Sequence, residues 1–276
     1  MKTILAISVF ALGASMLGEL AAADNSRAMY LANEGVLVTR GDTKVLFDPL
    51  FDNAFDRYDL LPNDMSRALF AGEPPFDGVD AVMVSHYHGD HFAPSLMLDY
   101  LRAQPEVRLY APMQAISGMR RAGGTNDEAL FERVVGVAID VGDEPLRFST
   151  GGLSIDAVRI PHAGWPNRMT DVENVVFRVT LDDAVTVVHL GDAEPAIGLF
   201  RQHTEYWGER VTDLALPPYW FFLSDSGEEV LDTEIDPRHA IGIHVPTAIP
   251  DDPSTRQAED KGYDLFTEPG EVREIP

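Results

Sequence analysis

Short runs of apolar, mainly β-branched residues recur along the chain and are separated by turn residues. Residues 35–40 and 44–47 flank the turn pair Gly41-Asp42 and predict a β-hairpin. Further strands are predicted over residues 79–84, 107–110, 153–160, 174–180, 185–190, 214–216 and 241–243. Helices are predicted over residues 95–102, after a proline, and 113–121, before two glycines. Many strands with few helices between them predict an α/β sandwich with its sheets inside and its helices outside.

The N-terminal segment has the pattern of a signal peptide. Lys2 is followed by an almost unbroken apolar stretch over residues 4–17 and then by Ala21-Ala22-Ala23. The stretch is shorter than the ~20 residues of a membrane-spanning helix, and it ends in small residues that suit a signal peptidase. We therefore predict a signal peptide over residues 1–23 and a single periplasmic or secreted domain over residues 24–276. No second apolar run of membrane length follows, so we expect no integral membrane segment in the mature chain.

Composition limits the chemistry that the chain can perform. The sequence contains no cysteine, which excludes disulfides, thiolate ligands and thiolate nucleophiles. Any metal must therefore be held by histidine and carboxylate. The formal net charge of −24 repels nucleic acid, so we expect a small-molecule substrate and no nucleic-acid partner. Nothing in the composition indicates an oligomeric state.

The strongest chemical signal lies directly after the strand predicted over residues 79–84. Three histidines and one aspartate fall within six residues there, namely His86, His88, Asp90 and His91. A loop at a strand end lets polar groups converge on an accessible point. His86 and His88 can project to one side while Asp90 and His91 turn to another, which suits two neighbouring metals. Imidazole and carboxylate are common ligands of zinc and related ions, so the hexad predicts metal binding.

Additional ligands must come from elsewhere, because one hexad cannot complete two coordination spheres. His162, Asp192 and His244 each follow a predicted strand. All three could therefore gather along one edge of the sheets. The three other histidines are expected not to bind metal. His189 is interpreted as a core residue or one that orients a ligand, and His203 and His239 as surface residues.

These motifs resemble those of the metallo-β-lactamase superfamily. Residues 86–91, His162, Gly191-Asp192 and His244 occur in the order of that family's ligands, after Asp48 near the end of an early strand. The resemblance covers nearly all of the mature chain and implies the family's four-layer αββα sandwich. It also implies that one metal is bound by His86, His88 and His162, that the other is bound by Asp90, His91 and His244, and that Asp192 bridges them.

The resemblance further implies a binuclear hydrolase in which two divalent ions share a water and supply hydroxide as the nucleophile. We expect Zn²⁺, with Mn²⁺ or Fe as alternatives, and Asp90 as a catalytic residue that accepts a proton or orients the nucleophile. True β-lactamases usually have cysteine or serine in place of Asp192, so antibiotic hydrolysis is not expected. Phe92, Asn174 and residues 242–246 resemble the lactonase and phosphodiesterase branch. That branch implies cleavage of a phosphodiester, lactone or related ester.

Substrate contacts are expected from Tyr219 and Trp220. They belong to the run Pro-Pro-Tyr-Trp-Phe-Phe at residues 217–222, and the family places this segment near the metal mouth. Asn174 is a further candidate for substrate binding. In the alternative interpretation, the aromatic side chains pack into the core and cover a helix.

Two other functions remain open from the sequence. One is a non-catalytic metal-binding protein on the same fold. The presence of all seven predicted ligands argues against this function. The other is an iron-dependent oxidoreductase. His88 argues against that function, because the di-iron flavoprotein branch usually has glutamate at this place.

Overall fold

The computed structural model describes residues 25–123, 127–256 and 262–276. The predicted signal peptide over residues 1–23 lies outside these ranges. None of the helices formed by the described residues is long and apolar enough to cross a membrane.

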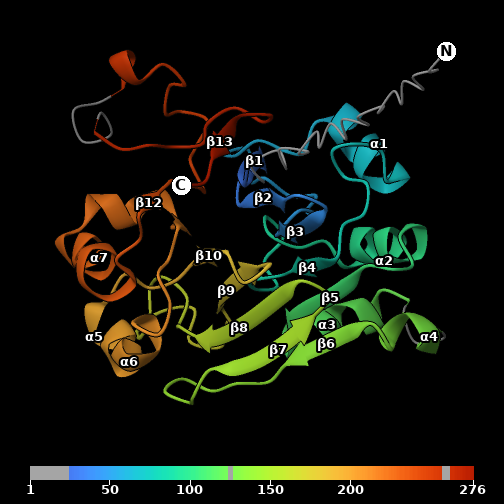
Figure 1. Cartoon of the computed structure of the whole chain (residues 1–276), viewed down its shortest axis with the longest axis horizontal. Helices are drawn as coiled ribbons and strands as arrows, with labels where there is room; N and C mark the ends of the chain where they lie inside the picture. The colour runs from blue at the N-terminus through green and yellow to red at the C-terminus, as the bar shows by residue number, and fades with distance from the viewer. Residues whose placement is uncertain (1–24, 124–126, 257–261) are drawn as a thin grey trace, which may run out of the picture.

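Two mixed β-sheets lie at the centre of the molecule (Figure 1). The first contains β1 (Arg27–Ala32), β2 (Gly35–Arg40), β3 (Thr43–Phe47), β4 (Ala81–Met83), β5 (Arg108–Pro112), β6 (Val134–Val137) and β13 (Val272–Glu274). The second contains β7 (Leu146–Thr150), β8 (Leu153–Arg159), β9 (Val175–Leu181), β10 (Val185–His189), β11 (Leu214–Leu216) and β12 (His239–Ala240). In the described part of the chain, the strand orders are β13-β1-β2-β3-β4-β5-β6 and β12-β11-β10-β9-β8-β7.

Helices cover the outer faces of both sheets. Those beside the first sheet are α1 (Asn63–Ala71), α2 (Pro94–Ala103), α3 (Met113–Arg121) and α4 (Glu128–Phe131). Those beside the second sheet are α5 (Ile197–Phe200), α6 (Thr204–Trp207) and α7 (Asp225–Glu229). Short 3₁₀ helices occur at η2 (Arg201–His203), η3 (Tyr219–Leu223) and η5 (Pro253–Thr255), and a π-helix at η4 (Val230–Ile235). Figure 1 shows α1 and α2 on one side of the molecule and α5, α6 and α7 on the other.

Three apolar clusters separate the layers. The cluster between the sheets includes Val45, Phe47, Ile155 and Val179, the cluster under α2 and α3 includes Leu46, Leu101 and Ile116, and the cluster under α5 and α6 includes Val176, Phe200 and Trp207. Neighbouring residues of one strand pack in different clusters because successive side chains point to opposite faces of a sheet. Val45 and Phe47 thus face the second sheet, whereas Leu46 faces the helices. The layers run helix, sheet, sheet, helix, which confirms the predicted four-layer αββα sandwich.

Two local predictions are wrong. The strand predicted over residues 241–243 is instead β12 at His239–Ala240, and Gly242 and Ile243 form only isolated bridges. The second concerns His203, which is buried rather than at the surface. It lies in η2, which connects α5 to α6, and these helices pack on the second sheet. Its polar sequence neighbours are exposed, so polarity alone did not indicate which side of this segment faces inward.

One edge of the sandwich collects the loops that carry the predicted ligands. β3 and β4 are parallel neighbours, so Asp48 and the loop of residues 86–91 emerge at the same end of the first sheet. β8 and β10 both pair antiparallel with β9, so His162 and Asp192 follow strand ends at one edge of the second sheet. β2 is antiparallel to β3, which places Glu34, in the β1–β2 turn, beside the end of β3. Segments distant in sequence therefore meet at one point.

Candidate metal centre

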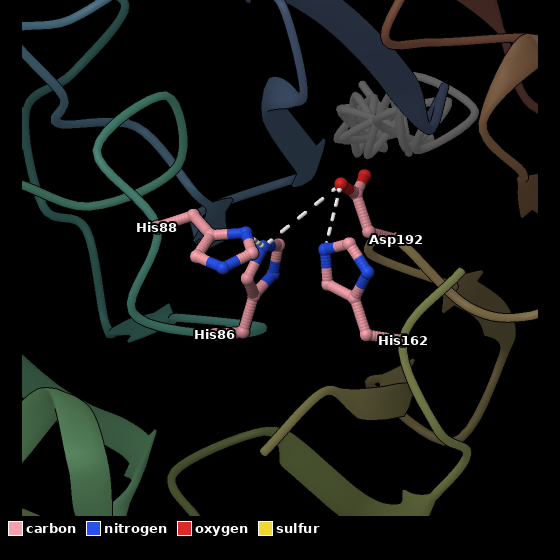
Figure 2. Close-up of side chains that lie close together, drawn as sticks. All are labelled: His86, His88, His162 and Asp192. Carbon is pink, nitrogen blue, oxygen red and sulfur yellow. Dashed lines mark hydrogen bonds and ion pairs between the residues drawn. The ribbon is translucent and has the colours of Figure 1, made fainter. Parts of the chain in front are cut away.

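The first group of candidate ligands consists of His86, His88, His162 and Asp192, whose donor atoms lie within 4.8 Å of one another. Figure 2 shows the imidazoles of His86 and His88, from the loop after β4, converging with His162 and Asp192 from two other loops. Nε2 of His162 lies 3.1 Å from Oδ2 of Asp192, and Nε2 of His86 lies 4.0 Å from the same oxygen. Nε2 of His86 is 3.1 Å from Nδ1 of His88. Three nitrogens and one oxygen at such separations suit a tetrahedral divalent metal.

The second group of close donors among the described residues consists of Glu34, His91, Asp192 and His244. Oδ1 of Asp192 lies 3.4 Å from Nε2 of His91 and 3.3 Å from Nε2 of His244. Asp90 lies beside this group, with its Oδ2 3.4 Å from Nε2 of His244 and 3.9 Å from Nε2 of His91. All seven predicted ligands are thus brought together, and Glu34 joins them.

Asp192 belongs to both groups, and its two carboxylate oxygens face different sides. Oδ2 is directed at His162 and Oδ1 at His91 and His244. In the described structure, Oδ1 of Asp192 and the Nε2 atoms of His91, His162 and His244 are buried and have no hydrogen-bond partner. Buried polar atoms normally find partners, because an unsatisfied one costs about 1–3 kcal/mol. A cation on each side of Asp192 would satisfy these atoms, so the residues present fit two metal ions.

The pKa values of the buried side chains also favour a cation at the centre. Burial and the neighbouring His91 lower the pKa of His86 well below its usual value, which keeps its imidazole in the neutral form that binds metal. Burial also acts on His91, but the carboxylates of Asp192 and Glu34 outweigh it and raise the pKa of His91. Burial would raise the pKa of Asp192, yet the charges of His244 and His91 hold it well below its ordinary value. Asp192 therefore remains anionic and attracts a cation.

Hydrogen bonds outside the two groups orient the imidazoles. Asp48 accepts hydrogen bonds from the backbone N–H and hydroxyl of Ser85, and from Nδ1 of His91 at 3.0 Å. Nδ1 of His162 donates to the carbonyl of Ala163 at 2.9 Å. Because Nδ1 makes these hydrogen bonds in both rings, Nε2 of each ring is the nitrogen directed at the centre. Asp48 has φ +39°, a conformation that few residues with a side chain adopt.

Gly191 permits the close approach of the two sheets at the centre. It has φ +52°, and a Cβ atom there would lie 2.5 Å from Oδ1 of Asn174 and 2.6 Å from Cβ of Ser85. Ser85 belongs to the loop after β4 and Asn174 to the segment before β9. Only glycine adopts this backbone conformation easily and has no Cβ atom to clash with these neighbours. Packing therefore requires glycine before Asp192.

Asn174 does not fit the predicted role in substrate binding. Its side chain is fully buried. Its Nδ2 donates to the carbonyls of Ile160 and Leu190 at 3.1 and 3.2 Å, and its Oδ1 accepts from the N–H of Asp192 at 3.0 Å. The amide therefore connects the ends of β8 and β10, and it positions the loops of His162 and Asp192.

The aromatic run predicted to contact substrate forms η3, and its members differ in environment. Phe221 is fully buried, whereas Tyr219 and Trp220 are partly exposed. The Trp220 ring lies 5.2 Å from the ring of His244, and Tyr219 packs against Trp220 at 5.9 Å. Tyr58, which was not predicted, meets His244 edge-on at 4.3 Å. Aromatic rings thus line the His244 side of the centre.

Glu34 is a candidate ligand that the sequence interpretation missed. It stands between β1 and β2, in an Asn-Glu-Gly turn that looks like an ordinary hairpin connection. The only available signal was a charged residue inside an otherwise apolar stretch over residues 28–38. β1 itself was not predicted, so nothing indicated that this turn faces inward.

Comparisons with known proteins agree with the fold described above. The family model described as a β-lactamase superfamily domain matches residues 43–217. No curated protein matches the sequence. Among solved structures, the chain resembles Igni18, a metallo hydrolase from Ignicoccus hospitalis, with TM-score 0.59, 16% identity, and coverage of 91% of this chain and 99% of that chain.

Two further structures show the range of chemistry on this fold. An isothiocyanate hydrolase from Delia radicum gut bacteria has TM-score 0.56 and 14% identity, with coverage of 90% of this chain and 98% of that chain. CmlA, a diiron β-hydroxylase from Streptomyces venezuelae, has TM-score 0.50 and 16% identity, with coverage of 91% of this chain and 54% of that chain. At these identities the likeness shows a shared fold and not a shared substrate.

Proposed function

Because this chain belongs to the metallo-β-lactamase superfamily, we propose that it is a binuclear metal-dependent hydrolase. Its substrate is a small molecule with a phosphodiester, lactone or related ester bond. The observation that carries the proposal is the placement of Asp192, whose two oxygens face two separate groups of candidate ligand atoms. The histidine-rich first group favours Zn²⁺, with Mn²⁺ or Fe as alternatives.

Two ions held by these residues would acidify a water that could act as the nucleophile and would polarise the bond under attack. The proposed role of Asp90 is to move a proton at its Oδ2, which lies 3.4 Å from Nε2 of His244. Burial would raise the pKa of Asp90, but the hydrogen bond to His244 and the charge of His91 hold it below its ordinary value. The carboxylate is therefore ionised near neutral pH and able to accept a proton or orient the attacking water.

The partly exposed rings of Tyr58 and Trp220 support a substrate that carries an apolar group. Both rings contact the ring of His244. Ligand sites commonly combine an apolar wall with a few convergent polar groups. Here the wall adjoins the candidate metal ligands, so the apolar part of a substrate would rest on the rings while the reacting bond faces the centre.

The proposal is tested by elemental analysis of the purified protein together with activity before and after chelation. The substrates are bis(p-nitrophenyl) phosphate, a lactone panel, nitrocefin and an isothiocyanate, the last because one structural neighbour hydrolyses that class. We expect close to two metal ions per chain and chelator-sensitive cleavage of a phosphodiester or lactone. If the purified protein contains no metal and added zinc, manganese or iron restores no activity, the catalytic function is contradicted.

The role of Asp90 has a separate test. In Asp90→Asn the side chain keeps its shape and loses its charge, so part of the metal should remain bound while kcat falls. General acid and base groups contribute about 10²- to 10⁴-fold, which sets the expected loss. Unchanged turnover in a metal-containing Asp90→Asn protein would refute the proton-transfer role.

Export to the periplasm or the medium is part of the proposal and rests on the pattern of residues 1–23. The test is the mass of the protein recovered from its native host. Cleavage after Ala23 supports export, whereas an intact N-terminus in the cytoplasmic fraction contradicts it.

A further inference from the structure

Glu34 presents an unusual buried carboxylate. Its side chain is fully buried, and within the described structure neither of its oxygens has a hydrogen-bond partner. A buried carboxylate without a partner is strongly unfavourable unless a positive charge or a proton compensates it. No arginine or lysine forms an ion pair with Glu34 among the described residues; its neighbours at ion-pair distance are His91 and His189.

The two neighbouring histidines do not satisfy the Glu34 carboxylate. Nδ1 of His91 lies 3.5 Å from Oε2 but 3.0 Å from Asp48, to which it donates. Nε2 of His189 lies 3.6 Å from Oε2 but 3.1 Å from the backbone carbonyl of Glu34, which accepts its proton. Nδ1 of His189 accepts from the N–H of Gly191. Each nearby ring proton is therefore used elsewhere.

A separate third ion beside Glu34 is not supported by the donors around it. Glu34, Asp48 and His189 do lie within 4.8 Å of one another. However, Asp48 already accepts from Ser85 and His91, and both nitrogens of His189 are occupied as described above. Of these three residues, only Glu34 has side-chain oxygens that are not already hydrogen-bonded. A single ligand of this kind does not form a metal site.

Glu34 also lies close to buried polar atoms that lack a hydrogen-bond partner. One of its oxygens lies within 4.8 Å of donor atoms of His91, Asp192 and His244. Oδ1 of Asp192 and the Nε2 atoms of both histidines are themselves unsatisfied. Metal–ligand bonds of about 2.0–2.2 Å place the ligands of one ion roughly 3–4.4 Å apart, which these separations approach.

We propose that Glu34 is a direct ligand of the metal held by His91, His244 and Asp192. This inference rests on the proposed function, because it requires that this group bind a metal. It makes the second site richer in carboxylate than the first, which has three imidazoles and only Asp192 as an acid. Carboxylate ligands suit manganese, whereas imidazole suits zinc, so the two sites should differ in metal preference.

The first experiment compares the wild-type full chain with Glu34→Gln by titrating the metal-free proteins with Zn²⁺ and, separately, Mn²⁺. Calorimetry follows the heat of binding, and electron paramagnetic resonance counts free Mn²⁺. We expect two binding events in the wild type and, in Glu34→Gln, a second event weakened more than 100-fold with the first unchanged. Two unchanged events would overturn the proposal, because they would mean that Glu34 is a protonated acid next to Asp192.

Glu234→Gln is the matched control, since it makes the same replacement at a buried carboxyl in η4, where Glu234 accepts from the hydroxyl of Thr204. Both of its binding events should be unchanged. Thermal melting adds a second readout. Without metal, Glu34→Gln should melt at about the same temperature as wild type, because glutamine keeps the shape of the side chain. With saturating metal it should melt at a lower temperature.

A direct measurement decides the matter if Glu34→Gln does not fold. Anomalous diffraction from metal-loaded wild-type crystals would locate both ions. A Glu34 oxygen within about 2.5 Å of the second ion supports the proposal, and a separation beyond about 3 Å overturns it. Wild-type protein that binds no metal would instead contradict the proposed function, whereas two bound ions with Glu34 uncoordinated would contradict this inference alone.

Discussion

The carboxylate of Asp48 lies 3.0 Å from Nδ1 of His91 and so determines which ring nitrogen of His91 faces Asp192. Asp48 is itself fixed by two hydrogen bonds from Ser85. Because β3 and β4 are parallel neighbours, the end of one strand orients the ligand carried on the loop of the other. The ligand geometry therefore depends on residues that do not contact the metal position.

Asp48→Asn should weaken metal binding at the second group by about 10- to 100-fold, the range found when such orienting partners are removed. Asparagine keeps the shape but loses the charge that holds the proton on Nδ1 of His91. Competition titration with a chromophoric chelator measures the change. Asp80→Asn serves as the control. The side-chain carboxylate of Asp80 accepts a hydrogen bond from the backbone N–H of Lys44, and Asp80 belongs to neither group of candidate ligands. Equal affinities in both variants would refute the orienting role of Asp48.

Asn174→Leu should destabilise the protein by about 3 kcal/mol or more and reduce its metal retention. Leucine has a similar size, but it leaves two carbonyls and the N–H of Asp192 without their partner, at about 1–3 kcal/mol for each buried group. Urea unfolding measures the stability, and dialysis followed by elemental analysis measures retention. Asn63→Leu, at an exposed position in α1, should change neither quantity. A stable, metal-replete Asn174→Leu protein would show that the amide is dispensable.

Arg178→Met should destabilise the fold by about 3–5 kcal/mol without changing metal affinity. The Arg178 guanidinium is 1% exposed, donates to Asp156 at 2.8 Å and to the carbonyl of Tyr206 at 2.6 Å, and lies over the Tyr206 ring. Its removal leaves a largely buried carboxylate unpaired. Arg147→Met removes an exposed pair with Glu209 and should cost only about 0–1 kcal/mol. Similar unfolding midpoints for the two variants would contradict this account.

His203 should make stability sensitive to mild acid. Burial lowers the pKa of His203 below its ordinary value, against the charge of Glu144, so the folded state keeps the ring neutral. The unfolded state takes up a proton as pH falls through about 6.5, and this uptake favours unfolding. The contribution of His203 is therefore present above pH 6.5 and is lost as pH falls toward the lowered folded-state pKa.

Urea unfolding at pH 7.5 and pH 5.5 in wild type and His203→Gln measures this effect. The loss of unfolding free energy between the two pH values should be smaller in His203→Gln. Identical losses would mean that His203 keeps its ordinary pKa in the folded protein.

The sequence predicted the sandwich and the seven candidate ligands because both have local signals. Strands such as β4 and β11 are continuous apolar runs, and the hexad of residues 86–91 is dense enough to stand out. Glu34 and Asn174 had no such signal. Their environments depend on which turn meets which strand end, and this is set by the pairing of β2 with β3 and of β8 with β9.

The first group draws His86 and His88 from the loop after β4 in one sheet, and His162 and Asp192 from loops after β8 and β10 in the other. An ion bound there would act as a cross-link between the two halves of the sandwich. Separation of the sheets would then require breaking coordination bonds as well as opening the apolar interface. Metal loading would therefore stabilise the tertiary structure, and protein made with too little metal would open more readily than metal-loaded protein.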